Sequence, residues 1–263
     1  MLTAESGLVA VMVTRWKCER VTDQASGLSS VRLRRSGTWH SRLGVIVPSV
    51  NVVVEHDAGL LLPEGVTLHV SRLKWLDEDH LESLVDELRS AADLLGDAHV
   101  RAIAFACTTG SCARGAGYDR ELIATIEAAS GVRATTTATA VIKALTALGA
   151  RRIALVSPYG DRNTGLLISF LTQSGFDVRT VVRLRTSPSE DLSVIDPVVI
   201  ANAARDAVAS GSPAIDAVFI SCTALRGLEA TALLEGTCSV PVISSNYATF
   251  WELVQAAGLG CPI

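Results

Sequence analysis

The chain has 263 residues, a net charge of −4 and 49% hydrophobic residues, few of them aromatic. This length suits one large domain or two modest lobes. The net charge is small and no basic stripe is visible beyond the amino-terminal stretch, so we expect neither nucleic acid nor a membrane as a partner. No apolar run is long enough to span a bilayer. An aliphatic, alanine-rich composition favours helices packed on a parallel sheet.

Residues 1–42 differ from the rest of the chain, because they are rich in arginine and serine and show no clear period. The apolar run LVAVMV is too short for the core of a signal peptide, and no small-residue cleavage site follows it. We therefore expect residues 1–42 to form a poorly ordered extension, with a peripheral packing arm as the alternative.

From residue 43 onward, strand-like and helix-like segments alternate. In the first half, strands are expected at 43–47, 66–72, 99–106 and 132–135, and helices at 51–61, 78–95, 119–129 and 138–148. In the second half, strands are expected at 151–157, 177–184, 216–221 and 240–244, and helices at about 163–175, 197–210, 227–236 and 247–257.

The two halves repeat the same order of elements. Each begins with a strand that runs into a proline loop carrying asparagine, VPSVN and SPYGDRN, and each has Cys-Thr after its third strand. This internal repeat predicts an α/β fold of two pseudo-symmetric, doubly wound lobes, at 43–148 and 149–263. Each lobe would hold a four-stranded, mainly parallel sheet flanked by helices, and an active-site cleft would lie between the lobes.

Cys107 and Cys222 are the leading candidates for chemistry, because each follows a buried apolar strand and precedes a threonine. The ends of parallel strands are where open α/β sheets bind ligands. Backbone N–H groups and a following helix would lower the thiol pKa and make the sulfur nucleophilic. The alternative is a small buried apolar residue, and we keep that reading for the remaining cysteines: Cys18, Cys112, Cys238 and Cys261.

No C-x-x-C or H-x-x-x-H pair occurs in the chain. The sequence therefore predicts no metal site and no disulfide framework, but free thiols in a reducing, cytoplasmic setting.

Small polar residues in the other strand-end loops are candidates for holding an anionic substrate. Helix capping and turn formation are the alternative roles for the serines and asparagines, and a half-buried structural position for the tyrosine. The candidate substrate-binding residues are Ser49, Asn51, Thr108, Thr109, Tyr159, Asn163, Thr223, Ser245 and Asn246.

Several segments together, including VIVPSVN, FACTTGSCARGAGYDRELIATIEAASGV, ISCTAL and PVISSNYATFW, resemble the aspartate/glutamate racemase superfamily. The resemblance covers about residues 43–258 and is greatest to the branch of maleate cis–trans isomerases and arylmalonate decarboxylases. It implies two α/β lobes, no metal or organic cofactor, a small carboxylate or dicarboxylate substrate and a homodimer.

The resemblance also implies roles for individual residues. Cys107 and Cys222 match the two catalytic cysteines. Asn51 and Tyr159 match residues that bind substrate, and Thr108, Thr109 and the Cys222–Thr223 backbone match groups that hold a carboxylate. Arylmalonate decarboxylases resemble this chain in the same segments but have glycine in place of the first cysteine. Cys107 therefore favours two-cysteine chemistry.

One segment departs from the family pattern. Isomerases of this type place an asparagine in the loop after the sixth strand, whereas this chain has RTSPSEDLSVIDP, with Glu190 and Asp191. A carboxylate there would repel a second substrate carboxylate.

The hypothesis that follows is a cofactor-independent cis–trans isomerase of a maleate-type acid, working through a covalent cysteine adduct and an enediolate. A racemase of amino or hydroxy acids would use the same two cysteines as acid and base. Arylmalonate-type decarboxylation, with Cys222 alone as proton donor, and carboxylate binding without catalysis are the remaining alternatives.

Overall fold

The computed structural model describes residues 40–74, 84–184, 191–209 and 214–259. The expected extension lies outside these ranges up to residue 39, and so does the start of the helix expected at 78–95. His40, Ser41 and Arg42 belong to the fold: the His40 N–H donates to Gly65 and the first strand begins at Ser41.

The first half forms a four-stranded sheet with the order β2-β1-β3-β4, in which every pair of neighbours is parallel. Its strands are β1 (Ser41–Pro48), β2 (Val66–Leu73), β3 (Ala102–Phe105) and β4 (Arg133–Thr136). The helices of this half are α2 (Val53–Leu61), α3 (Leu84–Asp97), α4 (Thr108–Cys112), α5 (Tyr118–Ser130) and α6 (Thr137–Ala147).

The second half repeats this topology with the order β6-β5-β7-β8, again all parallel. Its strands are β5 (Arg152–Ser157), β6 (Asp177–Arg183), β7 (Ala217–Ile220) and β8 (Val242–Ser244). Its helices are α7 (Asp161–Gln173), the 3-10 helix η1 (Leu192–Val194), α8 (Pro197–Ala209), α9 (Gly227–Leu234) and α10 (Ser245–Ala256). Two parallel sheets flanked by helices confirm the expected fold class.

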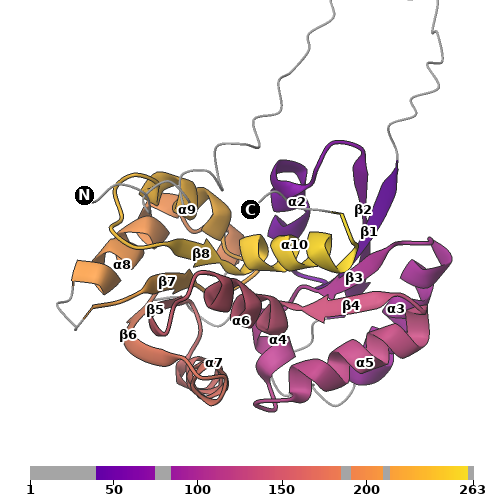
Figure 1. Ribbon diagram of the computed structural model, residues 1–263, viewed down its shortest axis with the longest axis horizontal. Helices are drawn as coiled ribbons and strands as arrows, with labels where there is room; N and C mark the ends of the chain where they lie inside the picture. The colour runs from indigo at the N-terminus through magenta and orange to yellow at the C-terminus, as the bar shows by residue number, and fades with distance from the viewer. Residues whose placement is uncertain (1–39, 75–83, 185–190, 210–213, 260–263) are drawn as a thin grey trace, which may run out of the picture.

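The last helix of each half packs on the sheet of the other half. Ala140, Val141 and Leu145 of α6 share a core with Leu155 and Phe219 of the second sheet. Figure 1 shows α6 and α10 side by side between the two sheets.

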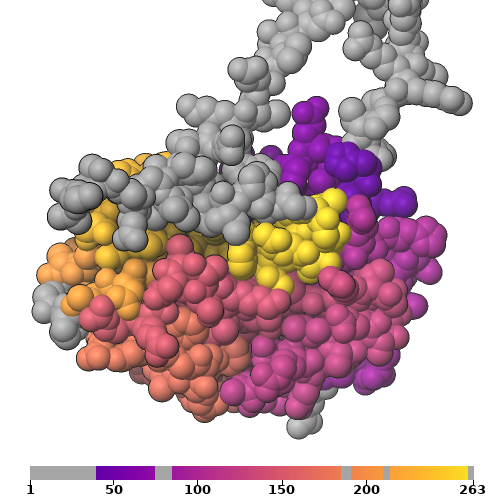
Figure 2. All heavy atoms as spheres, viewed as in Figure 1, coloured from indigo at the N-terminus to yellow at the C-terminus, as the bar shows by residue number. Residues whose placement is uncertain are grey.

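In the same way, α10 covers the first sheet. Its residues Phe250, Leu253 and Val254 share a core with Val45 and Ala104. In Figure 2, the yellow surface of α10 borders the magenta surface of the first half. The halves are thus joined by exchanged helices, and the assignment of 43–148 and 149–263 to two lobes stays a prediction.

Polar contacts reinforce the pairing of these two helices. The hydroxyls of Thr137 and Thr249 lie 2.9 Å apart in the buried interface. Lys143 forms an ion pair with Glu252, whose side chain is only 8% exposed. Among the residues that the structure describes, no helix has the length and hydrophobicity needed to cross a membrane.

Candidate active site

Cys107 and Cys222 occupy equivalent positions in the two sheets. Each is the second residue after its strand, since β3 ends at Phe105 and β7 ends at Ile220. These strands lie beside the first strand of their own half and run parallel to it. Both thiols therefore stand at the carboxyl ends of central strands, as the repeat in the sequence predicts.

Cys107 caps the short helix α4, with its sulfur accepting a hydrogen bond from the Gly110 N–H at 3.3 Å. A side chain at Gly110 would place its Cβ only 3.0 Å from this sulfur, so a larger residue there would push the sulfur by a few tenths of an ångström. The Thr109 hydroxyl lies 3.9 Å from the same sulfur. Cys107 is 5% exposed.

The expected lowering of the thiol pKa is wrong for both cysteines. Burial raises the pKa of Cys107 to about 11, which outweighs the opposing effects of the Gly110 N–H and the Thr109 hydroxyl. Burial also raises the pKa of Cys222, against hydrogen bonds from Ala224 and Tyr159. Desolvation disfavours the charged thiolate more than one or two hydrogen bonds favour it.

Cys222 has a backbone conformation that side chains rarely adopt, with φ +103°. Its N–H donates to the Ser245 hydroxyl at 3.0 Å, and its sulfur accepts from the Ala224 N–H at 3.4 Å. The residue is partly exposed, in contrast to Cys107. A non-glycine residue at such a φ is held there by its surroundings.

The side chains of Ser245 and Tyr159 join the two cysteine loops. The Ser245 hydroxyl lies 3.0 Å from that of Thr108, the residue after Cys107, and also accepts from the Cys222 N–H. The Tyr159 hydroxyl accepts from Ser221 at 3.3 Å and interacts with Thr108 and Cys222. Charge on Cys222 contributes to the raised pKa of Cys107, so the thiols are close enough to influence each other.

Asn51 and Thr223 form a second link between the halves. The Asn51 amide donates to the Thr223 hydroxyl at 3.1 Å, and that hydroxyl donates to the carbonyl of Ala106 at 3.1 Å. The side-chain oxygen of Asn51 (Oδ1) accepts from the Val53 and Val54 N–H groups at the start of α2. Asn51 therefore performs the capping role considered for it while lying against the residue that follows Cys222.

The other expected binding residues are distributed as follows. Asn246 donates to Asp57 and to the Thr223 carbonyl. Asn163 is buried in the first turn of α7, which begins two residues before the expected helix. Ser49 is exposed after β1, where its N–H donates to Leu73. Binding of substrate by any of these residues stays a prediction.

Two residues of this network were missed by the sequence reasoning. Ser221 hydrogen-bonds Tyr159, and Asp57 hydrogen-bonds Asn246. Ser221 immediately precedes Cys222 in the ISCT motif, which was a usable signal. Asp57 lies on a helix with exposed Glu55 and His56 as neighbours, so its burial depends on tertiary packing that the sequence does not reveal.

In the loop after β6, one of the two acidic residues caps the neighbouring 3-10 helix. Asp191 accepts from the Ser193 N–H at 2.9 Å and caps η1, and these hydrogen bonds lower its pKa. Glu190 lies outside the described residues.

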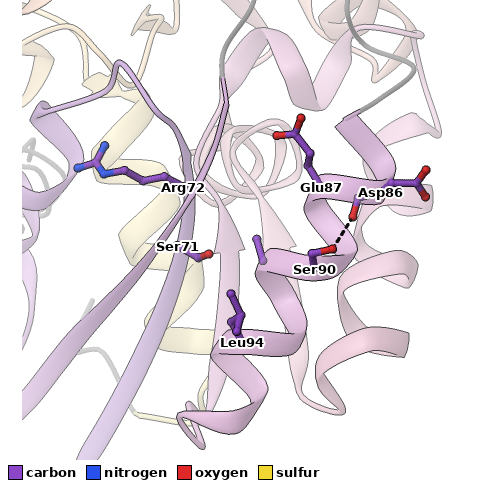
Figure 3. A pocket seen from close by; sticks show the side chains of 7 residues that line it. Ser71, Arg72, Asp86, Glu87, Ser90 and Leu94 are labelled. Atoms are coloured by element: carbon purple, nitrogen blue, oxygen red, sulfur yellow. Dashed lines mark hydrogen bonds between the residues drawn. The ribbon is translucent and has the colours of Figure 1, made fainter.

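A surface pocket of about 350 Å³ lies between β2 and α3 and contains none of the expected site residues. Figure 3 shows that Arg72, one of its lining residues, extends away from Glu87 and Ser90. The guanidinium of Arg72 donates to the backbone carbonyl of Asn51 at 2.7 Å and forms an ion pair with Glu55. Arg72 thus supports the loop that carries Asn51.

The fold and these contacts define an α/β protein with twin parallel sheets and a cysteine at the equivalent strand end of each. The chain belongs to the arylmalonate decarboxylase family, whose model matches residues 43–262.

The chain is similar to relatives with two different activities. A maleate isomerase of Pseudomonas putida is 29% identical over 233 residues, which cover 83% of this chain and 92% of the relative. The arylmalonate decarboxylase of Bordetella bronchiseptica is 27% identical over 221 residues, 81% of this chain and 92% of the relative. A crystal structure of a maleate isomerase from Pseudomonas putida with maleate superposes with a TM-score of 0.75 at 26% identity, covering 83% of this chain and 92% of that one.

Proposed function

We propose that this protein is a cofactor-independent isomerase of a small unsaturated carboxylic acid, acting by maleate-type cis–trans isomerisation. The observation that carries the proposal is the pairing of two thiols at equivalent strand ends, with Ser245 and Tyr159 between their loops. The maleate isomerase relatives support the same reaction class. Cys107 favours it over decarboxylation, because that thiol has no part in a reaction that needs only one proton donor.

In the proposed reaction, the Cys107 thiolate adds to an alkene carbon next to a carboxylate. A lone pair of the sulfur forms the carbon–sulfur bond, and the π electrons move onto the neighbouring carbon and its carboxylate as an enediolate. The former double bond is now single and rotates. The electrons then return, the carbon–sulfur bond breaks and the trans acid leaves, with no net oxidation or reduction.

The remaining residues stabilise the charge that develops in this step. Cys222 donates a hydrogen bond or a proton toward the enediolate and takes a donated proton back when the adduct eliminates, and the Tyr159 hydroxyl lies beside it. Thr108, Thr109 and Asn51 would hold carboxylate oxygens. Because burial keeps Cys107 largely protonated near neutral pH, its proton must pass to water or to a substrate carboxylate before attack.

Racemisation is the second candidate, favoured by the equivalent strand-end positions of the two thiols and by the effect of Cys222 on the pKa of Cys107. One thiolate would take the α-proton of an amino or hydroxy acid, and the other thiol would return a proton from the opposite face. A homodimer, expected from the family resemblance, remains part of the proposal.

Proton NMR in heavy water tests these reactions together. Purified protein is incubated with maleate, substituted maleates, aspartate, glutamate and arylmalonates. Conversion of a cis to a trans acid supports the proposal, deuterium exchange at a saturated α-carbon favours the racemase, and loss of carbon dioxide favours the decarboxylase. If none of these acids changes, binding without catalysis becomes the better description.

A further inference from the structure

Asp57 is a fully buried carboxylate on α2 to which the proposed reaction assigns no role. One of its oxygens accepts from the Asn246 amide at 2.7 Å, and the other lies 3.3 Å from the His56 ring nitrogen. A buried carboxylate is costly unless it is paired and hydrogen-bonded. The burial of Asp57 between α2 and α10 is therefore costly, and this cost needs an explanation.

The Asn246 amide connects Asp57 to the loop of Cys222. The same amide nitrogen donates to the carbonyl of Thr223 at 3.0 Å. The preceding residue, Ser245, accepts from the Cys222 N–H. The first two residues of α10 therefore bind the N–H of Cys222 and the carbonyl of Thr223. Asp57 anchors the second of these two residues, Asn246.

This hold coincides with the left-handed conformation of Cys222. A cysteine at φ +103° relaxes toward the ordinary regions unless the contacts on either side prevent it. The Thr223 hydroxyl adds a third contact, because it bonds to Ala106 and to Asn51 at the start of α2. Asp57 on α2 and Asn51 just before α2 thus contact the same part of the second half.

We propose that Asp57 is a positioning residue, which holds the Cys222–Thr223 loop through Asn246 so that the Cys222 thiol faces Tyr159. The inference rests on the proposed role of Cys222 as a reacting group. It identifies a carboxylate that acts on the site of the second half from a helix of the first half. His56 on the same helix, Glu229 on α9 and Arg226 just before α9 are the ionisable groups near it.

Two substitutions separate the hydrogen bond from the charge. Asp57→Asn keeps an oxygen that accepts from Asn246, whereas Asp57→Leu keeps the branched shape and removes the acceptor. The control is Asp119→Leu, since Asp119 is also a buried aspartate of the first half, accepting from the Thr139 hydroxyl at 2.6 Å. Circular dichroism establishes that each variant is folded.

The first measurement is the alkylation rate of each cysteine by iodoacetamide, followed by peptide mass spectrometry, which requires no substrate. We expect Asp57→Leu to accelerate alkylation of Cys222 at least about fivefold, because a loosened loop exposes its thiol. Cys107 should stay within about twofold, and Asp57→Asn and Asp119→Leu should leave both rates near those of the unmodified protein.

The second measurement is kcat and KM on whichever acid the protein converts. Asp57→Leu should lower kcat about tenfold to a hundredfold with little change in KM. Asp57→Asn should keep most of the kcat of the unmodified protein. Unchanged Cys222 labelling and kcat in folded Asp57→Leu overturn the proposal. If Asp57→Leu does not fold, Asn246→Ala cuts the same link from the other side, and equal labelling of Cys222 in that variant overturns it as well.

The two arms distinguish this inference from the proposed function. A protein that converts none of the tested acids contradicts the isomerase proposal, but the labelling of Cys222 still reports on Asp57. Equal labelling in a protein that isomerises maleate contradicts only the role of Asp57.

Discussion

The loops of Cys107 and Cys222 begin at equivalent places, two residues after a central strand, but their backbones differ from the cysteine onward. Cys107 has an extended φ of −147° and caps α4 directly, whereas Cys222 has φ +103° and the next helix begins only at Gly227. Cys107 is buried and Cys222 is partly exposed. A repeat in sequence can therefore place two thiols equivalently and still give them different backbones and different access to solvent.

The largest expected effect is on turnover. Cys107→Ala and Cys222→Ala should each lower kcat by about a thousandfold or more, since each removes a group that reacts directly. Cys112→Ala, which changes a buried cysteine five residues from Cys107, is the control and should retain activity. A covalent adduct found by mass spectrometry on Cys222 instead of Cys107 would reverse the roles proposed here.

The pH dependence of alkylation sharpens the difference between the two loops. At pH 8, Cys222 should react faster than Cys107 because it is more exposed. The pKa of about 11 for Cys107 means that its thiolate fraction, and hence its rate, should rise about tenfold per pH unit and level off only near that value. Free cysteine levels off near pH 8.5. A plateau for Cys107 below pH 9 would show that burial does not control its pKa.

The Ser245 side chain links the loop of Cys107 to the loop of Cys222, and its removal breaks that link. Ser245→Ala removes the acceptor of the buried Cys222 N–H and the partner of the Thr108 hydroxyl. We expect a loss of about 1–3 kcal/mol in the free energy of unfolding, measured by denaturant titration. Ser90→Ala on the exposed face of α3 is the control, with an expected change within about 0.5 kcal/mol. Equal stability of both variants would contradict the bridging role.

The smallest effect tests the backbone of Cys222. Because glycine adopts a positive φ without strain, Cys222→Gly should be more stable than Cys222→Ala by about 1 kcal/mol. At Cys107 the extended backbone suits any residue, so the order should reverse, with glycine about 0.5–1 kcal/mol less stable than alanine because it loses more conformational entropy on folding. Thermal unfolding of the four variants makes this comparison, and a similar difference at both positions would argue against strain at Cys222.

Sequence patterns predicted the strands and helices well, because apolar runs and glycine stops are local signals. The short helices α4 and η1 were missed, since five residues of TTGSC and three of LSV are too few for a period to be visible. The strand expected from 99 begins at Ala102, after His99 turns the chain with φ +52°.

The strand-end positions of the two cysteines were predicted from the sequence, but the direction of their pKa shifts was not. Motif and repeat located Cys107 and Cys222, whereas the direction of their pKa shifts depends on how deeply the fold buries them. The helix at 138–148 was expected from the sequence, but nothing in its spacing shows which of the two sheets it covers. Asp57 escaped notice for the same reason, since its partner Asn246 lies 189 residues away.

The exchange of α6 and α10 has a consequence for how this chain can be divided. A fragment cut between Leu148 and Gly149 would carry a helix meant for its counterpart and would expose the sheet face that the missing helix covers. The two fragments should consequently be insoluble when produced alone and recover when co-produced, each completing the other as a non-covalent heterodimer.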